Sequence, residues 1–76
     1  MPRIDFVTLR LFVAIAETRS LTRAAEREHL ALAAVSKRVS DLEGQLGVSL
    51  LYRQPKGVEL TPAGHALLHH ARNLLD

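Results

Sequence analysis

The sequence predicts a mainly α-helical domain in which two helices joined by a turn are followed by a small β-hairpin and a last helix. Three observations support this prediction. Apolar residues recur with the helical period over residues 33–46, residues suited to helix N-caps precede two other segments, and a Pro-Lys-Gly sequence can form a hairpin turn. The chain has 76 residues, which corresponds to one small domain.

The helix predicted from Ala33 to Leu46 has two unlike sides. Four apolar residues at i, i+4, i+7 and i+11 share a narrow arc that must be buried: Val35, Val39, Leu42 and Leu46. The other side carries only small or cationic residues: Ala33, Ser36, Lys37, Ser40 and Gly44. Such a side can lie close to a polar, anionic partner, and nucleic acid is the first candidate.

The composition is typical of a soluble cytoplasmic protein and is compatible with nucleic acid as a partner. There is no cysteine, so the sequence offers no disulfide or thiolate metal site and suits the reducing cytoplasm. No apolar run approaches the roughly 18 residues of a membrane span, so we expect a soluble cytoplasmic protein. The net charge of +2 permits nucleic-acid binding. A single core of this size only just offsets the entropy lost on folding, so we expect an extra staple or a partner chain to add stability.

The N-terminal helix is predicted from Asp5 to Arg19 and is apolar on more than one side. One stripe at helical spacing is assigned to the core: Leu9, Phe12, Val13 and Ala16. Leu11 and Ile15 form a second stripe on a flank that a lone amphipathic helix leaves polar. We expect this second stripe to contact either a neighbouring helix or a second subunit.

A short second helix is predicted over residues 21–28. Ser20 stands at its N-cap, where the hydroxyl can accept a hydrogen bond from the backbone N–H of Thr22 or Arg23. Ala24 and Ala25 are small enough to let another helix cross closely. No Gly or Pro ends this helix, so the turn before residue 33 is inferred from the change of apolar phase. The two helices form a helix-turn-helix candidate.

Gly47 suits the end of the long helix, and a hairpin follows with strands predicted at 48–53 and 58–60. Residues 54–57, with Pro55 second and Gly57 last, suit a type I turn. Arg53 and Lys56 make the tip basic, although a solvated turn explains the same two cations. Thr61 and Pro62 then suit the N-cap and first position of a last helix.

The last helix has a broad apolar face that continues to the end of the chain. Its members are Leu67, Leu68, Ala71, Leu74 and Leu75. Asp76 gives no stop signal, because it is neither Gly nor Asn and no Pro follows. We therefore expect the chain to be a fragment of a longer protein.

The motifs in this order and separation resemble the N-terminal DNA-binding domain of the LysR-type transcriptional regulators over almost the whole chain. They are Ser20-Leu21-Thr22-Arg23-Ala24-Ala25, Ala34-Val35-Ser36, Leu42-Glu43, Leu46-Gly47-Val48, Leu50, Arg53 and Leu60-Thr61-Pro62-Ala63-Gly64. The resemblance implies a winged helix-turn-helix over 1–61, with recognition helix 33–46 and wing 50–60. It further implies a linker helix from residue 62 that pairs in a homodimer and leads to an effector-binding domain outside this chain. The residues we assign to this dimer interface are Leu11, Ile15, Leu67, Leu68, Ala71, Leu74 and Leu75.

Site residues follow from placing the recognition helix in a major groove of double-stranded DNA with an inverted-repeat operator. We expect base contacts from Ser36, Lys37 and Ser40. We expect phosphate contacts from Ser20, Thr22, Arg23, Arg38, Arg53 and Lys56. The resemblance also allows Ser36 and Lys37 to contact phosphates, and puts Arg53 near the minor groove.

Some positions depart from the pattern of the family. Leu32 and Ala33 replace a common Gln-Pro, and Leu32 cannot read adenine as Gln does, so Ala33 or Ala34 could contact a thymine methyl instead. Glu28 replaces Leu, and Leu51 replaces Phe.

Three other functions have weaker support in the sequence. His65 and His69 have metal-ligand spacing, but their helix offers no Cys or nearby carboxylate, so we predict no metal and no cofactor. No phosphate loop, nucleophile with a base or carboxylate pair is recognisable, so we predict no enzyme. The remaining alternative is a protein-binding winged helix that presents the same exposed face to another protein, with Leu11, Ile15 and the last helix forming the interface. Such a docking face would carry an aromatic or Met anchor near Ser36 and Lys37, which the sequence lacks.

Overall fold

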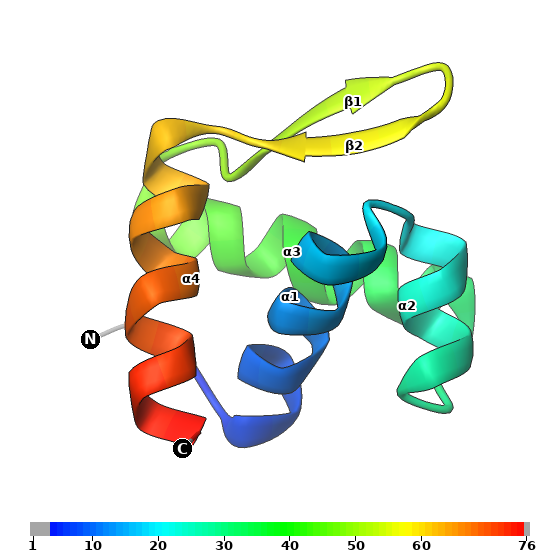
Figure 1. The fold of residues 1–76 in the computed structure, drawn as a ribbon, viewed down its shortest axis with the longest axis horizontal. Coiled ribbons are helices and arrows are strands. Elements are labelled where there is room, and N and C mark those ends of the chain that lie inside the picture. Colours follow the sequence, from blue (N-terminus) through cyan, green and yellow to red (C-terminus); the bar gives the residue numbers. More distant parts are fainter. Residues whose placement is uncertain (1–3, 76) are drawn as a thin grey trace.

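The computed structural model describes residues 4–75 and contains four helices and one two-stranded antiparallel hairpin (Figure 1). In chain order these are α1 (Phe6–Thr18), α2 (Leu21–Arg27), α3 (Leu32–Leu46), β1 (Leu51–Gln54), β2 (Gly57–Leu60) and α4 (Pro62–Leu75). The predicted winged helix-turn-helix is confirmed. Residues 1–3 of the predicted first domain, and Asp76 with its expected lack of a stop signal, lie outside the described residues.

Helix α1 occupies the centre of the fold and packs against α2, α3 and α4 (Figure 1). Its largest buried side chains are Leu11, Phe12 and Ile15. Of the two explanations for the second apolar stripe, the neighbouring helix is therefore the correct one. The assignment of Leu11 and Ile15 to a subunit interface was wrong, because their surface is already covered within a single chain.

The helix ends agree with the residues that cap them. The Ser20 hydroxyl accepts a hydrogen bond from the Arg23 backbone N–H at 3.1 Å, and the Thr61 hydroxyl accepts one from Gly64 N–H at 3.0 Å. Gly47 ends α3 at a φ of 70°, the left-handed conformation that glycine adopts at little cost. Asp5 and Arg19, predicted as helical, are the caps of α1, and Glu28 is the C-cap of α2.

The turn between α2 and α3 closes without glycine. His29 adopts a φ of 57°, its N–H donates to the Glu26 carbonyl at 3.2 Å, and Leu30 N–H donates to Ala25 carbonyl at 2.9 Å. This pair of bonds is a Schellman motif, in which histidine takes the position that glycine usually occupies. The motif ends α2, and α3 begins at Leu32, one residue before its predicted start.

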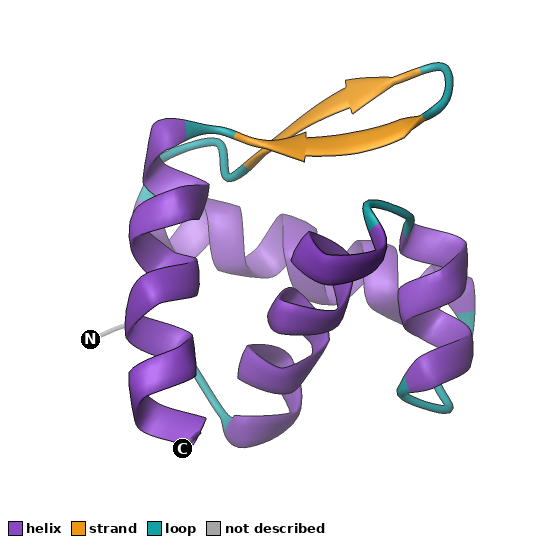
Figure 2. Ribbon diagram, in the orientation of Figure 1, coloured by secondary structure: helices purple, strands orange, loops and turns teal. Residues whose placement is uncertain are grey.

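The hairpin begins later than predicted, at Leu51, and a loop precedes it (Figure 2). Side chains of other elements hold this loop. The Glu43 carboxylate of α3 accepts hydrogen bonds from the backbone N–H groups of Leu50 at 2.7 Å and Leu51 at 3.3 Å. Residues 48–50 thus join α3 to β1 rather than pairing with β2. The register runs from Leu51 opposite Leu60 to Gln54 opposite Gly57.

A main-chain contact attaches the hairpin to the turn between α1 and α2. Val58 N–H donates to the Arg19 carbonyl at 3.1 Å. Gly57, beside it, has a φ of 144°, and a Cβ at this position would collide with the same carbonyl oxygen. Glycine is therefore required here twice, by its own backbone angle and by the closeness of another chain segment.

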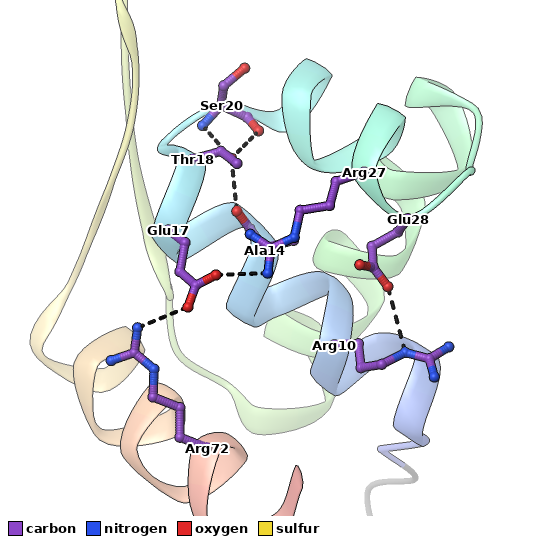
Figure 3. Close-up of polar contacts among 8 residues, drawn as sticks. All are labelled: Arg10, Ala14, Glu17, Thr18, Ser20, Arg27, Glu28 and Arg72. Carbon is purple, nitrogen blue, oxygen red and sulfur yellow. Dashed lines mark hydrogen bonds and ion pairs between the residues drawn. The ribbon is translucent and has the colours of Figure 1, made fainter. Parts of the chain in front are cut away.

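Two ion-pair groups connect the helices around α1 (Figure 3). The Glu17 carboxylate of α1 lies 2.7 Å from the Arg27 guanidinium of α2 and 3.4 Å from that of Arg72 in α4. The hydrogen bond from Arg27 is the main cause that lowers the pKa of Glu17, and Arg72 adds to it. Arg10 lies 3.5 Å from Glu28, so the acid that replaces the family's leucine has a cationic partner.

We expect Gly57→Ala to lower the free energy of unfolding by about 2 kcal/mol or more, since alanine would be strained at this φ and would push the hairpin away from α1. Urea unfolding followed by circular dichroism measures the change. Gly44→Ala is the control: apart from the adjoining backbone of α3, no described atom lies within 4 Å of a Cβ there, so alanine should stabilise α3 by up to about 1 kcal/mol. Equal stabilities of Gly57→Ala and the parent chain would contradict the close approach.

We expect the stability of the chain to fall on acidification, partly through Glu17. Its pKa is lowered in the folded state from an ordinary value of 4.5, so its contribution is present above that pH and is lost as the pH falls through the folded pKa. Glu17→Gln should reduce this loss by less than about 1 kcal/mol, because the pair is exposed. Urea unfolding at several pH values tests this. The same reduction in Glu59→Gln, whose carboxylate joins none of the ion pairs of residues 4–75, would contradict the assignment.

Candidate nucleic-acid interface

The two sides of α3 are separated as the sequence indicates. Val35, Val39 and Leu42 are buried. On the opposite side four residues are exposed: Ala33, Lys37, Ser40 and Gly44. Ser36 and Ala34 are half-buried on the flanks. The side without bulky apolar chains is therefore uncovered by the rest of the described chain.

Lys37 is the most prominent cation of this face, with its side chain 76% exposed. Its Nζ lies 3.0 Å from Oδ2 of Asp41, one turn further along α3. An exposed i,i+4 pair of this kind contributes only about 0.3–0.5 kcal/mol. The pair can therefore open at small cost when a stronger anion approaches the ammonium group.

Arg38 is engaged within the chain. Its Nη1 donates to the Thr8 hydroxyl at 3.0 Å and lies 3.5 Å from the Asp5 carboxylate. The Thr8 backbone N–H is the largest cause that lowers the pKa of Asp5, and Arg38 adds to it. These contacts join α3 to the N-terminus of α1, so a phosphate contact by Arg38 would have to share the guanidinium with Asp5.

The start of α2 and the hairpin line an open groove with a volume of about 370 Å³. Four residues predicted to contact phosphates line it together: Ser20, Thr22, Arg53 and Lys56. The five ion pairs found among residues 4–75 involve neither Arg53 nor Lys56, so both cations remain available to an anionic ligand. Arg23 is exposed but does not line the groove.

Sequence reasoning missed two residues that position these cations. Glu43 connects α3 to β1, as described above, and the Thr61 hydroxyl donates to the Ser49 carbonyl at 2.7 Å. Thr61 was identified as a helix cap and as part of a family motif, and Glu43 only as part of a family motif. An acid at the edge of the buried arc of α3, followed by a segment with free backbone N–H groups, is the signal that could have indicated the first contact.

Helix α4 retains only part of its predicted interface. Leu68 and Ala71 are buried against the helices of their own chain, so assigning them to a dimer contact was wrong. Leu67 and Leu75 are half-buried, and Leu74 is 65% exposed. These three side chains are accessible to a partner, and Leu74 is the most accessible of them.

The histidines of α4 lie at its surface. His65 and His69 are exposed, and Nε2 of His69 is 3.4 Å from Nδ2 of Asn73. Within residues 4–75 no group of three or more His, Cys, Asp or Glu side chains gathers in a way that could hold a metal ion. In the same part of the chain no helix has the length and apolar character that crossing a membrane requires.

An exposed helix of small and cationic residues, preceded by a short helix and followed by a basic hairpin, defines the class of winged helix-turn-helix DNA-binding domains. Residues 6–65 match the family model described as bacterial regulatory helix-turn-helix protein, lysR family. The chain belongs to this family.

Individual relatives agree with this membership. The chain is 41% identical over 73 residues to the HTH-type transcriptional regulator TcbR from a Pseudomonas species, covering 96% of this chain and 25% of TcbR. It is 47% identical over 75 residues to the HTH-type transcriptional activator AllS from Klebsiella pneumoniae, covering 99% of this chain and 28% of AllS. The chain thus spans about a quarter of the length of these curated relatives.

A solved structure gives the same result in three dimensions. The crystal structure of the CbnR_DBD-DNA complex superposes with a TM-score of 0.89 at 42% identity, covering 95% of this chain and 83% of that one. The similarity extends over almost all of the described residues, so it includes α3, the hairpin and α4.

Proposed function

We propose that this chain is the DNA-binding part of a dimeric bacterial transcriptional regulator that recognises a specific double-stranded sequence. Helix α3 enters the major groove with Ser36, Lys37 and Ser40 toward base edges, and Ala33 and Ala34 near the groove floor. The hairpin lies along the backbone near the minor groove, where Arg53 and Lys56 contact phosphates.

One observation carries this proposal: the uncovered side of α3 bears small residues and Lys37, without a bulky apolar group at its centre. A helix of about 10–12 Å diameter can enter a major groove about 12 Å wide, so short side chains bring its backbone close to the bases. Ser20, Thr22, Arg23 and Arg38 then serve as phosphate contacts that set the register of α3.

Dimerisation through α4 would supply the affinity that one small domain lacks. Two copies on one face of a duplex bind an inverted repeat, and the second contact forms at a high effective concentration. The remaining members of the predicted α4 interface, Leu67, Leu74 and Leu75, are the residues we assign to this contact. In this proposal the regulator acts in the cytoplasm, and any small-molecule effector binds outside these 76 residues.

A protein-docking winged helix is less well supported. Hot spots of protein interfaces are rich in aromatic side chains. The exposed aromatic residues Phe6 and Tyr52 belong to α1 and β1, and α3 itself carries no aromatic residue.

We expect Lys37→Ala to abolish sequence-specific binding while leaving the melting temperature nearly unchanged, since the exposed ammonium group makes only one weak ion pair. A random-duplex selection at fixed salt provides the target, and fluorescence anisotropy measures the affinity. Asp41→Ala is the matched control, because it breaks the same ion pair and keeps the cation. A large loss of stability in Lys37→Ala would identify the lysine as structural, and a selection without any enriched sequence would refute the proposed function.

We expect Arg53→Ala to weaken binding to specific and random duplexes alike, because a phosphate contact is independent of sequence. The slope of the logarithm of affinity against the logarithm of salt concentration should become shallower by about 0.9. Gln54→Ala, which changes an uncharged residue of the same groove, should leave this slope unaltered. Weakening confined to the specific duplex would argue against a phosphate role.

We expect Leu74→Asp to shift sedimentation from dimer toward monomer, because a charge would replace an exposed apolar side chain of α4. The fold should persist, since Leu74 contributes little to the core. Asn73→Asp adds the same charge at the adjacent exposed position, outside the proposed contact, and should leave the dimer intact. An unchanged sedimentation coefficient for Leu74→Asp would remove α4 as the interface.

A further inference from the structure

The first turn of α3 presents apolar side chains to the surroundings of the molecule. Leu32 is 47% exposed, and its neighbours Ala31 and Ala33 are exposed as well. Leu32 lies four residues before Ser36, so the two share one face of the helix. The exposed leucine is therefore continuous with the side of α3 that we assign to DNA.

The same turn lacks a polar cap. In the described chain the side chains of Asp5, Ser20 and Thr61 accept backbone hydrogen bonds at the starts of α1, α2 and α4. Ala31 holds the corresponding position of α3, where no side chain makes a capping hydrogen bond among residues 4–75. Ser, Thr, Asp or Asn would stabilise the helix there. A polar residue at this position would cap the helix and would be well solvated. The apolar residues found there instead indicate a contact outside the chain.

We propose that Leu32, with Ala33 beside it, contacts the 5-methyl group of a thymine in the major groove and determines the base preference at one position of each half-site. This inference rests on the proposed function. A leucine side chain has no donor or acceptor, so it cannot use the hydrogen-bonding edge of a base, whereas the thymine methyl is an apolar group in that groove. Ala34 is half-buried and contributes less than Leu32 or Ala33.

The test uses the 76-residue chain and the duplex obtained by selection. Each thymine is replaced in turn by deoxyuridine, which keeps the base pair and removes only the methyl group. One position in each half-site should lose affinity by about fourfold, the size expected for one buried methyl group. Leu32→Ala should abolish this uracil penalty. Val48→Ala, which shortens another aliphatic side chain of similar exposure, 45%, should keep it.

A second variant tests the assignment by a gain of function. Leu32→Gln introduces an amide that can bind N6 and N7 of adenine, so selection should change from thymine to adenine at the same position. Thermal unfolding verifies that each variant is folded. A specific complex that tolerates uracil everywhere, or an equal uracil penalty in Leu32→Ala, would overturn the role of Leu32 alone. The absence of any specific complex would instead overturn the proposed function together with this inference.

Discussion

Burial of the apolar side of α3 determines that its opposite side faces away from the domain. Helices α1 and α2 bury the apolar side. Val35, Val39 and Leu42 lie on a narrow arc, so their burial fixes the rotation of α3 about its own axis. Full burial of one aliphatic side chain stabilises the folded state by about 1.5–3 kcal/mol. If α3 rotated about its axis, several apolar side chains would become exposed and this stabilisation would be lost. The direction in which Lys37 points is thus a consequence of core packing.

Hydrogen bonds position the hairpin, which is the second part of the proposed DNA interface. A hairpin with four-residue strands is marginal alone, and here it is held at three places by other elements. Glu43 holds its beginning, Thr61 holds the segment before β1, and the Arg19 carbonyl holds Val58. Because Glu43 belongs to α3, the charged hydrogen bonds it accepts couple the position of the hairpin directly to the helix we assign to the major groove.

The sequence was most informative where structure is local. Periodicity identified both sides of α3, and the cap residues Ser20 and Thr61 located two helix starts within one residue. It failed where distant residues decide. Packing among the helices buried the second stripe of α1, which contains Leu11 and Ile15, and the sequence could not choose between a neighbouring helix and a second subunit as its partner.

Predicting the groove and the start of the hairpin would also have required knowledge of tertiary contacts. Residues of the α2 start and of the hairpin tip face one groove only because the hairpin folds back over the α1–α2 turn, as Figure 1 shows. The beginning of β1, at Leu51, depends on the Glu43 carboxylate eight residues earlier in the chain. Alternation and turn propensity describe neither contact, so they placed the strand three residues too early.

The tip of the hairpin extends beyond its hydrogen bond at Val58, with Pro55 and Lys56 at the edge of an open groove. Within residues 4–75, neither Pro55 nor Lys56 is joined to a helix by a hydrogen bond or an ion pair. In the proposed complex with DNA, a longer or shorter tip would change how far along the duplex a half-site extends, while the base pairs assigned to α3 would stay the same. Evolution can in this way alter the footprint of such a regulator separately from its sequence preference.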